Sequence, residues 1–330
     1  MIKKTFDQGW GAQWGWKQLE NRVVNTMLDR VAKDNSETVV INSVWYTSER
    51  HEETMAWLRE NTWDRIVLVA MLDASIPKPD WYAEFGREVI GLGYYPGNNE
   101  LDLCALFVEE FLDLTPYGDL SDTSMIDTPF MCLNRKPHWH RKKFYQSLEF
   151  LNLLDRGMVS MGSEDGNAVR TLPNDCEPDL IAPNSETQHY GIPNSVSSLG
   201  NADNWRRCFL NVVTETMYDI NRTNFVSEKI YKPIVGRRPF LVFDPDGAVK
   251  WLTDRGFESY VNDFKDISDL DLTRPEMVSQ FLVSLCDQPQ SYWQSKLVAL
   301  QPKIMHNSNN FQRYVAGQKQ RVQQGIQCQI

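Results

Sequence analysis

The chain has 330 residues and a formal net charge of −10, from 34 Lys and Arg against 44 Asp and Glu. At roughly 100–200 residues per domain, this length predicts two domains. A hydrophobic fraction of 42% excludes a wholly disordered chain. The acidic balance argues against a protein that coats nucleic acid through bulk charge, so we expect any anion-binding site to be a local basic cluster.

No segment of the sequence is apolar for long enough to cross a membrane. The longest clean apolar run, 66–72, is far shorter than the roughly 20 residues that a spanning helix needs. Two lysines near the start are not followed by the apolar core of a secretory signal. The six cysteines form no C-x-x-C pair, which favours buried free thiols in a reducing cytoplasm.

The first part of the chain alternates strand-like and helix-like segments. Continuous apolar runs predict buried parallel strands, and these lie at 39–41, 66–70 and 89–95. A helix is predicted at 49–61, whereas 103–114 fits either a helix or a strand. Turn-forming residues at 115–124 indicate a linker, so we place a first α/β domain, on the acceptor side, at 1–124.

The alternation resumes in the second part of the chain. The predicted strands are 130–133, 158–161, 209–213 and 239–243. The predicted helices are 140–156, 248–255, 275–286 and 291–324. We expect the first of these helices to end at Gly157 and the last to be interrupted at Pro302. The polar stretch 164–204 is expected to be an excursion, and the predicted divisions are a second α/β domain at 125–290 and a helical tail at 291–330 that packs back on the body.

A basic segment lies where the 130–133 strand passes into the next helix. The stretch 133–143 carries five Lys and Arg, two His and no acidic residue. Helix N-termini accept phosphate oxygens, and arginine binds phosphate through two parallel hydrogen bonds. One interpretation is a pyrophosphate site that uses Arg135 and Arg141, and the alternative is a solvated basic helix start. Metal binding by His138 and His140 is disfavoured because an H-x-H pair lacks a third ligand.

Polar residues also follow the 209–213 strand. Glu215 is expected at the carboxyl edge of the sheet, where α/β folds bind ligands. Ser227 is a natural N-cap for a short helix that begins with Glu228 and Lys229. Glu228 can accept hydrogen bonds from a ribose diol, and Lys229 and Lys232 can face phosphate. The alternative is a capped helix with a surface ion pair.

This second polar segment resembles a known donor-binding motif. Phe225-Val-Ser-Glu-Lys-Ile, followed by Gly236 and by Pro239 before an apolar strand, resembles the motif of the α-1,3-fucosyltransferase family. Thr214-Glu-Thr216 is similar to the family's Glu-Asn-Ser. The resemblance covers roughly 130–260, and the N-terminal half shows no resemblance.

The basic segment extends this resemblance. Leu133-Asn-Arg and His140-Arg141 look like the corresponding parts of uncharacterised phage and bacterial glycosyltransferase-like proteins. The resemblance implies two Rossmann-like domains that face a cleft, an arrangement of the glycosyltransferase-B type. It also implies a location in the cytoplasm of a bacterium or of an infected host cell.

The resemblance implies roles for individual residues. Glu228 would bind the ribose, Lys229 the diphosphate, and Arg135 or Arg141 would supply a second phosphate cation. The other donor-binding residues that we assign are Asn134, His140, Glu215, Thr216, Ser227 and Lys232. Thr216 stands where the family has Ser, and Lys232-Pro-Ile-Val replaces the family's Asn-Ala-Leu region. The sugar and base can therefore differ from those of GDP-fucose.

Sugar transfer also requires a carboxylate that takes the acceptor proton. Asp73, directly after a predicted strand, is our first candidate and Glu49 the second, and the alternative for each is a loop or cap acid. Asp244-Pro-Asp246 matches a D-x-D metal motif but also forms a ready-made turn before the helix at 248, and we favour the turn. We therefore expect no metal cofactor, and lysines, arginines and helix N-termini would meet the charge of the leaving group.

The resemblance, together with these residues, implies an inverting, metal-independent glycosyltransferase whose donor is a nucleotide-diphosphate sugar. Its acceptor would be a glycan or hydroxymethylated DNA. The alternatives are a noncatalytic nucleotide-binding protein of the same fold, a metal-dependent transferase that uses Asp244 and Asp246, and an enzyme that epimerises the nucleotide sugar.

Overall fold

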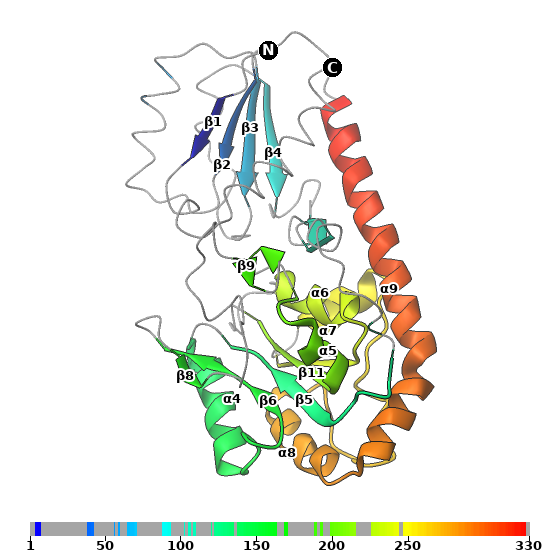
Figure 1. The fold of residues 1–330 in the computed structure, drawn as a ribbon. Coiled ribbons are helices and arrows are strands. Elements are labelled where there is room, and N and C mark those ends of the chain that lie inside the picture. The colour runs from blue at the N-terminus through cyan, green and yellow to red at the C-terminus, as the bar shows by residue number, and fades with distance from the viewer. Residues whose placement is uncertain are drawn as a thin grey trace. The chain divides into compact units, whose positions relative to one another are not determined.

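The computed structural model divides the protein into two compact units (Figure 1). The first unit holds residues 1–110, 184–186 and 315–330, and the second holds 111–183 and 187–314. The structure describes residues 4–7, 38–42, 56, 59, 65–70, 88–93, 102, 105–106, 108–109, 120, 122–134, 137–163, 168–170, 188–189, 192–193, 199–215, 226–243 and 247–327.

The first unit contains a four-stranded parallel sheet of order β1-β2-β3-β4. Its strands are β1 (Lys4–Asp7), β2 (Thr38–Asn42), β3 (Arg65–Ala70) and β4 (Glu88–Gly93). The sheet confirms the three predicted strands, whereas β1 was not predicted because it is short and Phe6 is its one apolar residue. Of the predicted 49–61 helix, residues 56 and 59 are described, and both are helical.

The segment that fits either a helix or a strand is helical wherever it is described, at residues 105–106 and 108–109. Asp102 caps this turn, since its Oδ1 accepts from the N–H of Ala105 at 3.0 Å. The N–H of Asp102 in turn donates to Oε1 of Gln318 at 3.0 Å. These bonds tie the turn to the end of the last helix within the first unit.

The second unit contains another four-stranded parallel sheet, of order β12-β11-β5-β6. Its strands are β5 (Thr128–Cys132), β6 (Met158–Val159), β11 (Cys208–Thr214) and β12 (Phe240–Phe243). All seven residues of β11 are buried, as expected for a central strand covered on both faces. This sheet confirms the predicted strands, and both units together confirm a mixed α/β fold with parallel sheets.

Short antiparallel pairs accompany this sheet. They are β7 (Met161–Gly162) with β8 (Ala168–Arg170), and β9 (Gln188–His189) with β10 (Ile192–Pro193). Strands β8, β9 and β10 lie within the stretch 164–204 that we expected to be an excursion, and β7 ends just before it.

Six helices are described with bounds: α4 (Trp139–Phe150), α5 (Ala202–Arg207), α6 (Glu228–Val235), α7 (Ala248–Asp254), α8 (Pro275–Cys286) and α9 (Gln290–Gln327). In the view of Figure 1, α6 and α7 lie above the strands β11 and β5, and α8 lies below them. Helix α8 packs against β5 and β12, and α5 and α6 pack against β11. The sheet is therefore covered on both faces.

Helix α4 ends earlier than predicted. Asn152, and not Gly157, takes the left-handed conformation that stops it, with φ of 56°. The N–H of Leu153 then bonds to the carbonyl of Leu148 at 2.8 Å, and the Leu153 side chain is fully buried. Gly157 has another role, because the ring of Phe130 occupies the space that a Cβ there would need.

Helix α9 continues through Pro302, so the predicted interruption is wrong. Buried Leu300 and Ile304 anchor the helix on either side of the proline. Nζ of Lys303 also reaches Asp263 at 2.6 Å and the carbonyl of Ser259 at 3.0 Å. These contacts hold the helix in place around Pro302, where one backbone hydrogen bond is missing because proline has no N–H.

Aromatic side chains join three helices of the second unit. The ring of Tyr231 on α6 lies 5.3 Å from that of Phe311 and 6.3 Å from that of Trp251, measured between centroids. Tyr314 packs against both Tyr231 and Trp251. Helix α6 is therefore held by α7 and α9 as well as by β11, which sets the position of its N-terminus.

Candidate functional site

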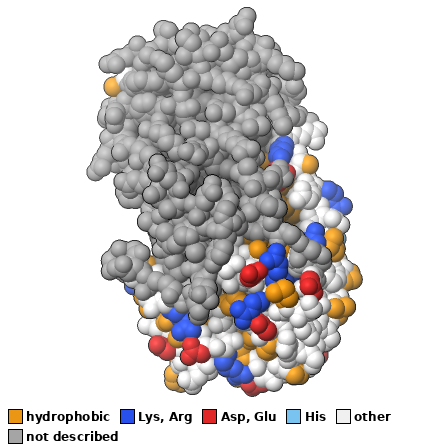
Figure 2. All heavy atoms as spheres, viewed as in Figure 1, with side chains coloured by type: hydrophobic (Ala, Val, Ile, Leu, Met, Phe, Trp, Pro, Cys, Tyr) orange, Lys and Arg blue, Asp and Glu red, His pale blue; other side chains and the backbone are white. Residues whose placement is uncertain are grey.

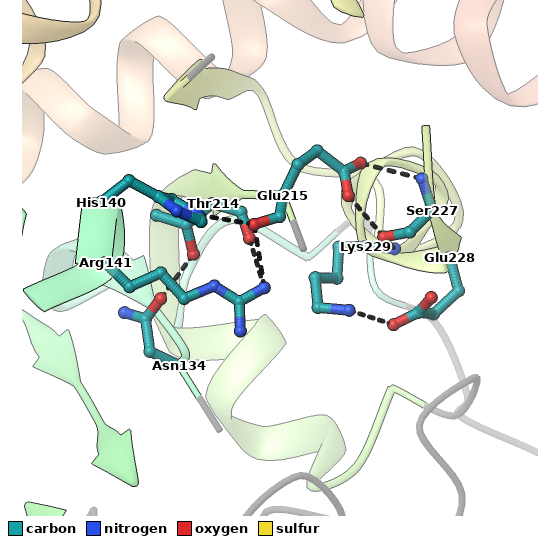
Figure 3. A network of polar contacts seen from close by, with 8 residues as sticks. All are labelled: Asn134, His140, Arg141, Thr214, Glu215, Ser227, Glu228 and Lys229. Atoms are coloured by element: carbon teal, nitrogen blue, oxygen red, sulfur yellow. Dashed lines mark hydrogen bonds and ion pairs between the residues drawn. The ribbon is translucent and has the colours of Figure 1, made fainter. Parts of the chain in front are cut away.

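Parallel pairing brings the carboxyl ends of β5 and β11 to one edge of the second sheet. Asn134 follows β5, and Thr214 and Glu215 form and follow the end of β11. The Oγ1 hydroxyl of Thr214 donates to Oδ1 of Asn134, which closes this edge (Figure 3). Asn134, Thr214 and Glu215 are each at most 2% exposed, so their polar atoms are held away from water.

The first turn of α4 attaches to the same strand end. Arg141 is 2% exposed, and its Nη2 donates to the carbonyl oxygens of Thr214 at 2.9 Å and Glu215 at 3.0 Å. Nε2 of His140 lies 2.8 Å from the same Glu215 carbonyl. The first turn of α4 contains no acidic residue, so the Arg141 guanidinium places at the strand end a positive charge that no acid of this turn compensates.

His140 is held neutral by its surroundings. Burial lowers its pKa from 6.5 to about 4; the bond to the Glu215 carbonyl acts in the opposite direction, and the charge of Arg141 lowers the pKa further. A carbonyl oxygen accepts only, so Nε2 carries the proton and Nδ1 the lone pair of the neutral ring.

Glu215 connects β11 to the start of α6. Its two carboxylate oxygens accept from the N–H of Ser227, at 3.1 Å, and from the Ser227 hydroxyl. The same hydroxyl accepts from the N–H of Lys229 at 3.3 Å and so caps α6. Ser227 is fully buried, and this confirms the predicted N-cap.

Burial raises the pKa of Glu215 above its ordinary value. The charge of Lys229 and the hydrogen bonds from Ser227 act in the opposite direction, whereas the neighbouring Glu228 raises the pKa further. The Glu215 carboxyl group therefore bonds within the protein interior, and its hydrogen bonds to Ser227 orient the start of α6.

Glu228 and Lys229 form an ion pair in the first turn of α6. The Glu228 side chain is 6% exposed and the Lys229 side chain 19%, so the lysine is the more accessible partner. An ammonium group has three donors, so a lysine at this position can contact a carboxylate and an anionic ligand at the same time. Lys232 follows at i, i+3 from Lys229 and is half-buried.

The structure brings together most of the predicted donor-binding residues: Asn134, His140, Arg141, Glu215, Ser227, Glu228 and Lys229 (Figure 3). Lys232 lies one turn farther along α6. Arg135 and Thr216 lie outside the described residues, as do the catalytic candidates Asp73 and Glu49 and the Asp244-Pro-Asp246 motif.

Two further residues hold the site in place. Thr214 bonds to Asn134, and Ser160 Oγ accepts from the N–H of Asn134 at 3.2 Å. Ser160 is fully buried and stands directly after β6. Each is a hydroxyl at the carboxyl end of a predicted strand, and that position was the signal that could have identified it.

Arg238 is a basic residue near the motif that does not contribute to this site. It is 1% exposed, and its guanidinium donates to the carbonyls of Cys208 at 2.7 Å and Leu120 at 2.6 Å. Cys208 begins β11, so Arg238 lies at the amino end of the strand whose carboxyl end carries Glu215. Burial lowers the pKa of Arg238 to about 10. Its role is to satisfy backbone acceptors in the core.

On the face shown in Figure 2, Lys and Arg side chains are interspersed with Asp and Glu. Among the described residues, no group of three or more His, Cys, Asp and Glu could hold a metal ion. Within the same residues, no helix is both long and apolar enough to span a membrane.

Comparisons with protein-family models, with curated proteins and with solved structures found no match to this chain. The function is therefore argued from the geometry of the site.

Proposed function

We propose that this protein is a glycosyltransferase that binds the diphosphate of a nucleotide sugar at the carboxyl edge of β5 and β11. One observation carries the proposal: residues from four separate segments, chosen from the sequence for their chemistry, converge in one buried hydrogen-bonded network. The carboxyl edge of a parallel sheet is where open α/β folds bind their ligands. The two α/β units would be the two Rossmann-like domains of a glycosyltransferase-B type protein.

The start of α6 supplies the proposed anion site. Backbone N–H groups and the helix dipole favour negative charge there, and Lys229 adds a full positive charge. The Arg141 guanidinium, which two carbonyls hold in place, adds a second positive charge near the Glu215 strand end. The diphosphate would bond to Lys229, with Lys232 as a second lysine on the helix, while the Glu228 carboxylate accepts from the ribose hydroxyls.

The proposed reaction is a direct displacement at the anomeric carbon. The oxygen of an acceptor hydroxyl forms the new bond to that carbon, and the bond from the carbon to the diphosphate oxygen breaks. The nucleoside diphosphate leaves with the bonding electron pair, and a carboxylate takes the hydroxyl proton. Asp73 and then Glu49 remain our candidates for this base. The positive site at α6 would stabilise the departing charge in place of a metal ion.

A thermal-shift screen of UDP, GDP, CMP and ADP, each alongside an intact sugar nucleotide, tests the donor site. A ligand present at 100 times its Kd should stabilise the protein by about 2.7 kcal/mol. Lys229→Met should abolish the shift, whereas Lys250→Met should retain it, because Lys250 is an exposed lysine that pairs with Asp254 on α7. No shift with any nucleotide would rule out the proposal.

Turnover separates an enzyme from a binding protein of the same fold. Release of free nucleoside diphosphate should be measured with glycan and hydroxymethylated DNA acceptors, with and without EDTA. Acceptor-dependent release that EDTA does not affect supports the proposed mechanism. Binding without release would assign a noncatalytic role, and loss of activity in EDTA would restore Asp244 and Asp246 as metal ligands.

A further inference from the structure

A groove lies along α4, on a different face of the helix from the polar network. One wall is α4 itself and the other is formed by the paired strands β7 and β8, and the two border an open cavity of about 720 Å³. Figure 1 shows α4 and β8 beside each other. This volume lies within the roughly 300–1,000 Å³ that is typical of small-molecule sites. The residues that the argument uses are Lys142, Tyr145, Gln146, Glu149, Met161 and Val169.

The two walls differ in chemistry. Lys142, Tyr145, Gln146 and Glu149 follow one another at i, i+3, i+4 and i+7, so they form one polar stripe on α4. The buried residues of the helix are His140, Arg141, Phe144 and Leu148, which belong to the opposite face. The facing wall is lined by Met161, Gly162, Ser163 and Val169; Met161 is only 2% exposed, and the apolar surface of this wall comes mainly from Val169, which is 61% exposed.

The polar wall has hydrogen-bonding capacity that the described residues do not use. Among them, no hydrogen bond or ion pair engages the phenol of Tyr145, the amide of Gln146 or the carboxylate of Glu149. Arg170, on the neighbouring β8 strand, is different. Its guanidinium donates to the carbonyls of Val159 and Leu154 and to Asp155. Within the described residues, the guanidinium of Arg170 is thus paired by the protein, whereas these three polar groups at the cavity are not.

We propose that this groove binds a neutral saccharide. A pyranose ring has an apolar C–H face and an edge of hydroxyl groups, which matches one apolar wall opposite one wall of donors and acceptors. The Glu149 carboxylate can accept hydrogen bonds from vicinal hydroxyls, and the Gln146 amide can both donate and accept them. The Tyr145 phenol contributes both a ring face and a hydroxyl. One lysine and one glutamate balance in charge across the stripe, which favours a neutral ligand over a phosphate.

This inference goes beyond the proposed function and does not depend on it. A saccharide could occupy the groove whether or not a nucleotide binds at α6, because the two sites use different residues of α4. In a glycosyltransferase the groove would hold a sugar unit of a glycan at a distance from the reacting hydroxyl. In a noncatalytic protein it would be a saccharide-binding site alone.

The test is ligand-observed NMR on the full chain without any nucleotide. The probes are trisaccharides of glucose, galactose and N-acetylglucosamine, with uridine and guanosine as non-saccharide probes. Titration calorimetry then gives Kd for the trisaccharide that binds best, for the wild type and for four variants. Gln146→Ala, Glu149→Ala and Val169→Asp alter the two walls, and Lys143→Ala is the matched control on an exposed residue of the same helix outside the cavity.

We expect at least one trisaccharide to bind, and each wall variant to raise its Kd about tenfold or more, since each loses a polar contact or places a charge on the apolar wall. Lys143→Ala and Lys229→Met should retain wild-type Kd. Three outcomes overturn the inference: no trisaccharide binds, the wall variants bind as the wild type does, or the wall variants weaken binding of a nucleoside instead. None of these outcomes bears on nucleotide binding at α6.

Discussion

His140 provides a quantitative test of the buried network. Its Nε2 donates to the Glu215 carbonyl at 2.8 Å, and burial lowers its pKa from 6.5 to about 4. Replacement by Gln keeps a side-chain N–H that can reach the same carbonyl but removes the titrating ring. The variant therefore separates the hydrogen bond from the charge.

The magnitude follows from the two pKa values. In the unfolded chain His140 takes up a proton near pH 6.5, whereas in the folded protein it does so only near pH 4. The stabilising contribution is thus fully present above pH 6.5 and is lost as the pH falls through about 4. At roughly 1.4 kcal/mol for each pH unit, the loss amounts to about 3 kcal/mol of unfolding free energy.

The assay is urea unfolding of wild type and His140→Gln at pH 7 and at pH 4. The raised pKa of Glu215 acts in the opposite direction above pH 4.5, so the difference between the two proteins is the informative quantity. Between pH 7 and pH 4, the wild type should lose about 3 kcal/mol more than the variant. His306→Gln, at a histidine whose side chain is 41% exposed, is the control for removing one histidine. An unchanged difference between wild type and His140→Gln at the two pH values would refute a buried, neutral His140.

Two further predictions concern the helix termini and close packing. Ser227→Ala removes a helix cap and a hydrogen bond to a buried carboxylate, and should lower the free energy of chemical unfolding by about 2–4 kcal/mol. The control Asn201→Ala removes only the cap of α5 and should lower it by about 1 kcal/mol. Equal losses in the two variants would contradict the contribution of the bond from Ser227 to Glu215. Gly236→Ala should lower stability by about 1–3 kcal/mol because a Cβ there meets the indole ring of Trp205, whereas Gly317→Ala, with nothing within 4 Å, should raise it by about 0.5–1 kcal/mol. Thermal unfolding measures both glycine variants, and a stabilising Gly236→Ala would show that the reasoning about packing is wrong.

Much of the second unit could be predicted because its signals are local. The run at 130–133 is apolar throughout and the run at 209–213 is apolar except for Asn211, as expected for strands covered on both faces, and the structure places β5 and β11 there. Pro275 predicts the start of α8, since a first-turn position does not need its missing N–H. Ser227 predicts the start of α6 for a similarly local reason.

Other features depend on tertiary contacts that no short segment reveals. The end of α4 at Asn152 depends on burying Leu153, and the passage of α9 through Pro302 depends on packing on both sides of the proline. In the same way, the position of Arg141 at a helix start indicates an anion site, whereas the fold directs its donors to two strand-end carbonyls. The sequence therefore identified the residues of the site but not the hydrogen bonds that orient them.

The central claim is that the start of α6 binds a nucleoside diphosphate. Titration calorimetry of UDP, GDP, CDP and ADP into wild type, Lys229→Met and Lys250→Met tests it most directly. We predict that one nucleoside diphosphate binds the wild type and Lys250→Met equally, and that Lys229→Met binds it at least about tenfold more weakly, as expected for loss of a charged hydrogen bond. Equal affinity in Lys229→Met and wild type, or no binding by the wild type, would contradict the claim.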